Sequence, residues 1–300
     1  MIYMNDTNSL SFNKHNEAIS DASNNNYAFN SQRICAVGAV YRNDDPGYFR
    51  AALTSVFAQI NISFDVHLVV DGPIGKDLET VINDFSNNLN IIRLPSSVGL
   101  GLALNTIFEK NIYSKYDIAI RYDSDDINYS DRFYCLVDAM NRNNLDLVGS
   151  HIHEIDGDSK IIGQRTVPLS SSRINLFKNI INPFNHPSTA LNVNALEKVG
   201  GYRHCYLHED WLLWLYFIKM GFNVANVDKF LVGFRMNQGT INRRFGSDFR
   251  KHEINFYKQA IGNKLLNPFL AIIGLAARQI SKLLGRSTFQ LLYRKLRKHN

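Results

Sequence analysis

The sequence predicts an α/β fold with an open, mostly parallel β-sheet flanked by helices. Two observations lead to this fold. From Arg33 to Gly149, short apolar runs alternate with amphipathic segments of helix length, which is typical of right-handed β-α-β units. After Gly149 the alternation stops, and short strands with turn residues predict a smaller mixed sheet. The 300 residues, 45% hydrophobic and 20% charged, are enough to bury a globular core.

The first half of the chain divides into strands and helices in regular order. Its first apolar run is continuous, as expected for a strand buried on both faces, and Pro46 is suited to the first turn of the helix that follows. The expected strands are residues 33–41, 64–70, 90–94, 118–120 and 145–149, and the expected helices are residues 46–59, 76–85, 100–108 and 129–140.

The second half begins with an expected hairpin, residues 151–154 and 161–167, around Asp156-Gly157. A loop at 182–192 then leads into a short strand, a segment at 196–202 ends in two glycines, and an aromatic helix covers 207–217. Strands are expected at 223–227 and 230–234. His151, His153 and Glu154 resemble part of a second metal site. Strand alternation puts the two histidines on one face, but no third ligand is evident, so an exposed hairpin surface is favoured.

Charge and cysteine content narrow the class of protein. The net charge is +6. From position 278 onward the sequence has seven basic residues and no acidic one: Arg278, Lys282, Arg286, Arg294, Lys295, Arg297 and Lys298. The three cysteines are far apart, match no metal spacing and indicate free thiols in a reducing, cytosolic setting. Residues 1–30 lack the features of a signal peptide, and no apolar run reaches the roughly 18 residues of a membrane span.

The acidic run at the end of the 118–120 strand is the main candidate site. Asp123, Asp125 and Asp126 follow this short apolar strand directly. Carboxylates this close raise one another's pKa unless a positive charge lies among them, so a divalent cation, Mg²⁺ or Mn²⁺, is the expected partner. Such an ion keeps open positions that diphosphate oxygens fill. The alternative is a solvated turn, since Asp and Ser are common turn formers.

Other polar residues also follow strand ends. Tyr41 with Asp44 comes after the first strand and Asp71 after the second, so these residues and the acidic run are expected at one rim of the sheet. The Asp71 carboxylate is suited to accept the imide N–H of uracil, although an Asp before Gly-Pro is also a common turn. Gly99-Leu100-Gly101 lacks the third glycine of a dinucleotide site and is interpreted as a helix-opening loop rather than an NAD site.

Glu209 and Asp210 begin the aromatic helix. Acids at a helix N-terminus are stabilised by the helix dipole, which is a purely structural reason for their presence. Two carboxylates ahead of so apolar a helix also fit the mouth of a pocket, where one of them acts as a general base.

A set of motifs in a fixed order resembles the family 2 glycosyltransferases, which have the GT-A fold, and in particular the bacterial branch that builds surface polysaccharide such as O-antigen. The resemblance covers roughly residues 34–235, and several linked motifs are more specific than any one of them. The motifs are residues 37–43, Asp71-Gly72, 98–105, 121–126, His186-Pro187-Ser188, 200–203 and 208–215.

The resemblance implies an inverting, metal-dependent hexosyltransferase that uses a UDP-sugar donor and a polyprenyl-diphosphate-linked sugar acceptor. Asp210 would be the catalytic base, with Glu209 orienting it or the acceptor. His186 and Trp211 would contact the acceptor, and Asp123, Asp125 and Asp126 would hold Mn²⁺ or Mg²⁺. The residues implied to bind the nucleotide-sugar are Tyr41, Asp44, Asp71, Asn105, Arg121, Asp123 and Arg235.

The expected organisation is a flexible Asn- and Ser-rich leader (1–32), a nucleotide-sugar half (33–150), an acceptor and catalytic half (151–262) and a basic amphipathic helical tail (263–300). The tail fits an anionic inner-membrane surface, which predicts a cytoplasmic, peripheral protein; the alternative is a helix packed on the domain. A sugar nucleotidyltransferase and a basic binding module are the competing functions. No nucleic-acid partner is expected, because the first 250 residues show no basic, aromatic face.

Overall fold

A computed structural model describes residues 32–236 and 247–283. Residues 1–31 of the predicted leader (1–32) and residues 284–300 of the predicted tail (263–300) lie outside the described residues. The strands are β1 (Ile34–Val40), β2 (Asp65–Val70), β3 (Leu89–Arg93), β4 (Ile118–Arg121), β5 (Ile127–Asn128), β6 (Leu147–Ile155), β7 (Ile161–Arg165), β8 (Ala190–Asn192) and β9 (Val224–Arg235). The α-helices are α2 (Pro46–Phe57), α3 (Lys76–Phe85), α4 (Leu100–Ile107), α5 (Arg132–Asn143), α6 (Ser171–Phe177), α7 (Val193–Val199), α8 (Glu209–Lys219), α10 (Ser247–Gly262) and α11 (Pro268–Leu283).

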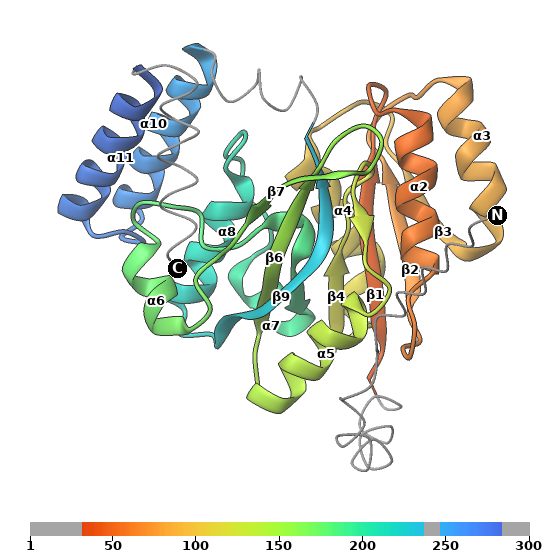
Figure 1. Cartoon of the computed structure of the whole chain (residues 1–300), viewed down its shortest axis with the longest axis horizontal. Helices are drawn as coiled ribbons and strands as arrows, with labels where there is room; N and C mark the ends of the chain where they lie inside the picture. Colours follow the sequence, from red (N-terminus) through yellow and green to blue (C-terminus); the bar gives the residue numbers. More distant parts are fainter. Residues whose placement is uncertain (1–31, 237–246, 284–300) are drawn as a thin grey trace, which may run out of the picture. The chain divides into compact units, whose positions relative to one another are not determined.

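The described strands form one continuous sheet with a parallel half and a mixed half (Figure 1). The strand order is β3-β2-β1-β4-β8-β6-β9-β5, and β7 pairs with β6. The strands β3, β2, β1 and β4 are parallel, β8 is antiparallel to both of its neighbours, and β6 is parallel to β9. The α/β fold class expected from the sequence is confirmed, and the mixed strands extend the parallel sheet through the β4–β8 pair.

Several element boundaries differ from the predicted ones because of long-range pairing. The helix expected from Tyr129 begins at Arg132, since residues 127–128 pair with β9 as β5 and the Tyr129 N–H donates to the Leu231 carbonyl at 3.1 Å. The strands expected at 145–149 and 151–154 are the single strand β6. The strands expected at 223–227 and 230–234 are likewise joined in β9, which follows β6 along its length through two register shifts.

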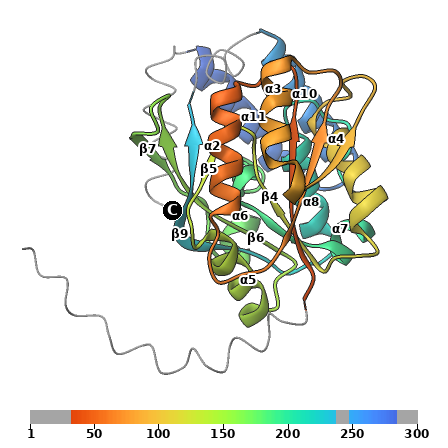
Figure 2. The ribbon, with the colours of Figure 1, turned by 90° about the vertical axis from the view of Figure 1, so that its right-hand side faces the viewer.

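One face of the sheet is covered by α4, α7 and α8. Their apolar side chains form a core cluster with inward residues of β1 and β4, including Leu104, Leu196, Trp214 and Cys35. Figure 2 shows α2 and α3 side by side, packed along the parallel half. This packing fixes the loops that follow the carboxyl ends of β1, β2 and β4.

The chain ends, within the described residues, in a pair of helices that the sequence did not fully predict. The helix α10 was not expected, and α11 is the described part of the predicted tail. Leu265 and Leu266, between the two helices, are buried with Trp211 of α8, Phe256 and Tyr257 in a second core cluster. Across the described residues, no helix combines the length and the apolar character that a membrane crossing requires.

Candidate active site

Polar side chains follow three neighbouring parallel strands at one edge of the sheet. β1 lies between β2 and β4, so their carboxyl ends lie together. The chain leaves β1 at Tyr41 and Asp44, β2 at Asp71, and β4 at the acidic run 123–126. The Ser124 hydroxyl donates to the Asp44 carboxylate at 2.8 Å and joins two of these loops. The prediction that these residues share one rim is confirmed.

Asp71 holds the loop between β3 and α4. Its Oδ1 accepts the Val98 N–H at 2.7 Å, and its Oδ2 accepts the Ser97 hydroxyl at 2.8 Å and the Gly99 N–H at 3.1 Å. Gly99 precedes α4 with a φ of 88°, so the expectation of a helix-opening loop is confirmed. A carboxylate has about four acceptor positions, and these three hydrogen bonds leave one of them, on Oδ1, without a donor among the described residues.

The three clustered aspartates lie in different surroundings. Asp123 is paired with the buried Arg121 and is 21% exposed. Burial, together with the charge of Asp123, raises the pKa of Asp125 to about 7. Asp126 is 1% exposed; its Oδ1 accepts a backbone N–H from β9 at 2.9 Å, whereas its Oδ2 has no hydrogen-bond partner among the described residues. Two of the three carboxylates thus lie where their negative charge is disfavoured.

This donor set fits a divalent cation. An ion beside Asp123 and Asp125 would relieve the repulsion that raises the pKa of Asp125. In the described part of the chain, no three His, Cys, Asp or Glu side chains are grouped closely enough to enclose a metal. Such a cation would therefore be held by one or two carboxylates and completed by diphosphate oxygens and water, as is usual for Mg²⁺.

Two buried arginines lie beside the cluster. Arg121 donates to the Val37 carbonyl at 3.2 Å and to Asp123, and Arg132 donates to the Arg121 carbonyl at 2.6 Å. Burial lowers the pKa of Arg132 to about 9, opposed by the charges of Asp126 and Asp123. Sequence reasoning missed Arg132, whose only signal was a charge within an amphipathic helix.

Arg235 joins the β6–β7 hairpin to the acidic loop. Its guanidinium is buried and donates to the carbonyls of Asp125 at 2.9 Å, Asp156 at 2.7 Å and Gly157 at 2.9 Å. The guanidinium carbon also lies 4.1 Å from the centre of the Tyr48 ring. These contacts occupy most of its donors, so in this structure Arg235 supports the loop rather than lining an open surface.

Glu209 and Asp210 form the first turn of α8 near the same cluster. Burial, with smaller contributions from Asp210 and Asp123, raises the pKa of Glu209 to about 7. Burial also raises the pKa of Asp210 to about 6, although hydrogen bonds from the Trp211 N–H and from Asn182 oppose the increase. The Asn182 amide donates to Asp210 Oδ2 at 2.7 Å. Two acids with raised pKa values therefore lie within electrostatic range of Asp123 in the acidic run, an arrangement that suits base catalysis next to a charged leaving group.

A sequence profile for the family described as "Glycosyl transferase family 2" matches residues 37–200, more than half of the chain. The chain belongs to glycosyltransferase family 2. This confirms the family resemblance and favours a glycosyltransferase over the nucleotidyltransferase and binding-module alternatives.

Named relatives of this glycosyltransferase are bacterial. It is 33% identical over 264 residues, covering 86% of this chain and 94% of the relative, to the Escherichia coli protein named UDP-Gal:alpha-D-GlcNAc-diphosphoundecaprenol beta-1,3-galactosyltransferase. It is 28% identical, over 87% of this chain and 97% of the relative, to the amylovoran biosynthesis glycosyltransferase AmsE of Erwinia amylovora. The expected bacterial polysaccharide branch is thereby confirmed.

A solved structure shows the same fold. The mannosyltransferase PcManGT of Pyrobaculum calidifontis, in complex with GDP-Man and Mn²⁺, superposes with a TM-score of 0.59 and 13% identity. The match covers 87% of this chain and 78% of that chain. At this level of identity the likeness establishes the GT-A-type fold of the glycosyltransferase.

The remaining predicted site residues of the glycosyltransferase contact other parts of the protein. His186 Nε2 lies 2.8 Å from the Tyr202 hydroxyl, and burial with the charge of Arg121 lowers the pKa of His186 to about 3. Asn105 exchanges two hydrogen bonds with the Tyr202 backbone, at 2.7 and 2.8 Å. Trp211 is 1% exposed and packs against α10, where it has no open surface for a sugar.

The alternative metal site on the hairpin is not favoured by its contacts. His151 and His153 share one face, as expected, but Phe230 covers both rings. His151 pairs with Asp228 and Glu154 pairs with Arg165. These residues therefore hold the hairpin of the glycosyltransferase in place.

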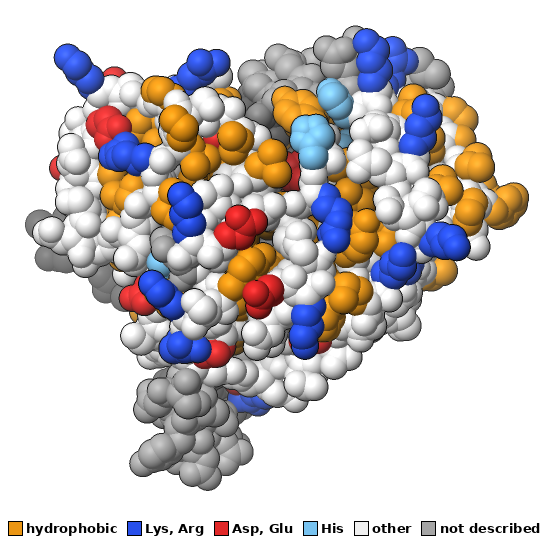
Figure 3. Space-filling view, turned by 180° about the vertical axis from the view of Figure 1, so that it is seen from behind, with side chains coloured by type: hydrophobic (Ala, Val, Ile, Leu, Met, Phe, Trp, Pro, Cys, Tyr) orange, Lys and Arg blue, Asp and Glu red, His pale blue; other side chains and the backbone are white. Residues whose placement is uncertain are grey.

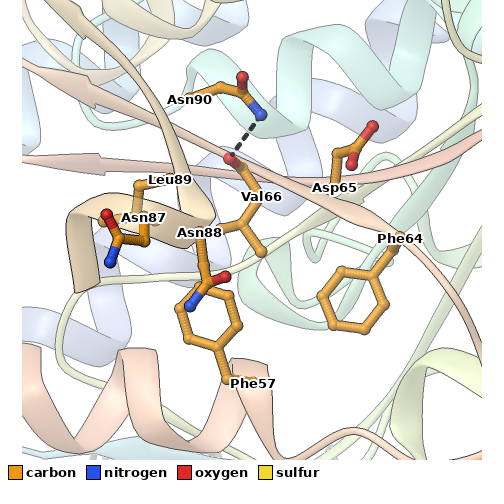
Figure 4. A pocket seen from close by; sticks show the side chains of 8 residues that line it. All are labelled: Phe57, Phe64, Asp65, Val66, Asn87, Asn88, Leu89 and Asn90. Carbon is orange, nitrogen blue, oxygen red and sulfur yellow. Dashed lines mark hydrogen bonds between the residues drawn. The ribbon is translucent and has the colours of Figure 1, made fainter.

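A separate hollow lies at the opposite end of the parallel strands. It has a volume of about 350 Å³ and is lined by the start of β2, the start of β3 and the end of α2, including Phe57, Phe64 and Asp65 (Figure 4). The Asn90 amide donates to the Val66 carbonyl of the neighbouring strand at 3.4 Å (Figure 4). Since the acidic loops of the glycosyltransferase follow the other strand ends, this hollow is distinct from the candidate active site.

Proposed function

We propose that this glycosyltransferase transfers a hexose from a UDP-sugar to a sugar carried on a polyprenyl diphosphate, in the synthesis of O-antigen or capsule repeat units. The observation that carries the proposal is the approach of two raised-pKa acids, Glu209 and Asp210, to the acidic edge after β4. The name of the E. coli relative, which contains UDP-Gal and a diphosphoundecaprenol acceptor, supports both substrate classes.

On the acceptor side, Asp210 is the catalytic base. It takes the proton of an acceptor hydroxyl, whose oxygen bonds to the anomeric carbon while the bond from that carbon to UDP breaks. Because this is a single displacement, an α-linked donor gives a β-linked product. A pKa of about 6 leaves Asp210 mostly ionised at neutral pH and more basic than an ordinary Asp. Glu209 and His186 orient the acceptor, and Trp211 acts indirectly by fixing α8.

On the donor side, Asp71 accepts the imide N–H of uracil at the position left open on Oδ1. Tyr41, Asp44 and Asp123 complete the nucleotide-sugar contacts. The other donor-side residues, Asn105, Arg121 and Arg235, position these loops through the bonds described above. Residues 33–150 thus bind the donor and residues 151–262 supply the acceptor side.

Metal dependence follows from the same residues. Mn²⁺ or Mg²⁺ would be held by Asp123 and Asp125, with Asp126 supporting the loop, and would neutralise the charge that develops on the departing diphosphate. The raised pKa of Asp125 supports this assignment, since a cation favours the ionised carboxylate.

We also propose that α11 rests on an anionic membrane surface. Its outward side chains form an apolar row, with Phe269 72%, Ile272 61% and Ile280 56% exposed. In Figure 3, hydrophobic side chains gather at the edge of the molecule over α10 and α11. Arg278, the first of the seven basic residues from position 278 onward, is paired with the buried Glu253, and an anionic lipid surface would attract the positive charge of this segment.

The nucleotide specificity is tested by a thermal-shift panel. The purified chain is mixed with UDP, GDP, CMP, dTDP or NAD, each with and without Mn²⁺. A ligand at about 100 times its dissociation constant adds about 2.7 kcal/mol to the free energy of unfolding. We expect a shift with UDP that needs the metal, is lost in Asp125→Ala and is kept in Asp158→Ala, an exposed aspartate of the hairpin turn. A shift with NAD alone, or none with UDP, would contradict the proposal.

A further inference from the structure

The helices α10 and α11 both contact a short loop segment, residues 179–180. The Tyr257 hydroxyl of α10 donates to the Asn179 carbonyl at 3.1 Å, and the Asn267 N–H at the start of α11 donates to Asn179 Oδ1 at 3.0 Å. Gly274 of α11 packs on the same peptide, where an added Cβ would lie 2.5 Å from the Asn179 carbonyl oxygen. The backbone at Asn179 is therefore held from both helices.

The same two helices are joined to each other by a buried ion pair and also contact α8. Glu253 of α10 is fully buried and accepts Arg278 Nε at 2.6 Å and the Gln279 amide at 2.7 Å. The Arg278 guanidinium also lies 5.3 Å from the Trp211 ring centre and donates to the Ile180 carbonyl at 3.4 Å. Removing one partner of such a buried pair is costly, so the arrangement is rigid.

Asn182 follows this loop segment by two residues and contacts the proposed base, Asp210. Asn182 Oδ1 accepts the Phe184 N–H at 3.3 Å, which fixes the orientation of the amide, and Nδ2 donates to Asp210 Oδ2 at 2.7 Å. A hydrogen bond to a carboxylate favours its ionised form and holds it in one orientation. The Asn182 amide thus occupies an acceptor position on Asp210 Oδ2 and holds the carboxylate in place.

We propose that Asn182 is a positioning residue for Asp210 and that α10 and α11 set its place. The inference rests on the proposed role of Asp210, and it assigns an effect on the active site to helices that lie outside the family-matching residues 37–200. The other titratable and charged groups around Asp210 are Glu209, which precedes it on α8, Asp123 after β4, Tyr202 with its neighbour Arg121, and His186. Of the side chains around Asp210, Asn182 is the one whose hydrogen bond to the carboxylate opposes the effect of burial on its pKa.

The test is a direct titration of Asp210 in the full-length chain. Carbon-13 NMR of labelled Asp carboxyl groups follows each signal with pH, and the Asp210 signal is assigned by its loss in Asp210→Asn. We expect Asn182→Ala to raise the pKa of Asp210 by about one unit, because a charge-assisted hydrogen bond is lost. Gly274→Ala, which must displace Asn179, is expected to shift the same signal in the same direction by less.

The control is Gly262→Ala at the end of α10, where an added Cβ meets nothing within 4 Å. It should leave the Asp210 titration unchanged. An unaltered titration in Asn182→Ala overturns the positioning role. A Gly274→Ala chain that melts at lower temperature but titrates like the wild type overturns the part assigned to α10 and α11. If Asp210→Asn retains transfer activity with UDP-galactose and N-acetylglucosaminyl-diphospho-undecaprenol, the base assignment fails instead, whatever the titration shows.

Discussion

Glu209 and Asp210 are adjacent in the sequence, yet their surroundings differ. The amide of Asn182 and backbone N–H groups stabilise the ionised form of Asp210, whereas Glu209 Oε2 is buried without a hydrogen-bond partner among the residues that the structure describes. The sequence predicted both acids because they open an apolar helix. It did not predict Asn182, since the importance of a loop amide depends on a contact 28 residues away.

The pH dependence of transfer follows from Asp210. A base must be unprotonated to accept the acceptor proton, and burial sets the pKa of Asp210 at about 6. We therefore expect kcat/KM to rise as the pH increases through about 6 and to level off above it. Asp210→Asn should lower kcat by about 10²- to 10⁴-fold without lowering the melting temperature. A rate that is flat between pH 5 and 8 would contradict the assignment.

The contribution of Glu209 to the stability of the fold should decrease with increasing pH, whereas the transfer rate increases. Burial raises its pKa from 4.5 to about 7, so between these values the folded chain keeps a proton that the unfolded chain has released. Stability contributed by this group therefore falls as pH rises through that window. We expect Glu209→Gln to be more stable than the wild type at pH 8, by about 1–3 kcal/mol, and equal to it below pH 4. Denaturant melts at both pH values measure this difference.

At the scale of elements, the loop after α7 depends on one close approach. Gly201 has a φ of 65°, and a Cβ there would lie 2.6 Å from Asn105 Oδ1, the atom that accepts the Tyr202 N–H. We expect Gly201→Ala to lower the free energy of unfolding by about 2–4 kcal/mol, through backbone strain and loss of the hydrogen bond between Asn105 and the Tyr202 N–H. Gly221→Ala is the matched control, because Gly221 has a φ of 78° with nothing within 4 Å, so it carries the strain alone. An equal decrease in the free energy of unfolding in the two variants would show that this hydrogen bond contributes nothing.

The helix α11 has apolar residues on two sides: Ala271 and Leu275 pack inward on the second core cluster, whereas Phe269, Ile272, Ile273 and Ile280 are exposed. We expect the double change Ile272→Asp and Ile273→Asp to weaken binding to phosphatidylglycerol vesicles by about 100-fold, since burying these two exposed isoleucines in the membrane interface would contribute about 3 kcal/mol. The melting temperature in solution should not change.

The control for vesicle binding is Ile161→Asp, an equally exposed isoleucine on β7. It should bind vesicles like the wild type. Vesicle sedimentation that does not distinguish the α11 variant from this control would contradict the membrane proposal.

For the whole molecule, the order of strands and helices in residues 33–149 follows from local patterns, because each β-α-β unit buries its own apolar face. Where the expectations differ from the structure, the cause is pairing between distant segments. Ile127 and Asn128 become a strand only because β9 lies beside them. The helix α10 has little apolar periodicity of its own. Its position depends on Phe256 and Tyr257, which pack against Trp211.

The site shows the same division. The edge residues Tyr41, Asp44, Asp71 and the acidic run were predictable because carboxyl ends of parallel strands meet. The buried contacts of Arg235, Trp211 and Asn105 were not, since each depends on a partner at least 45 residues away in sequence for which no local pattern exists.

The most direct measurement of the central claim is the anomeric configuration of the product. Purified chain, Mn²⁺ and a panel of UDP-hexoses are incubated with N-acetylglucosaminyl-diphospho-undecaprenol, and proton NMR reports the coupling constant of the new linkage. The account predicts one β-linked hexose from an α-linked UDP donor, formed only with the metal and absent in Asp210→Asn. An α-linked product, or no transfer from any UDP-hexose, would contradict it.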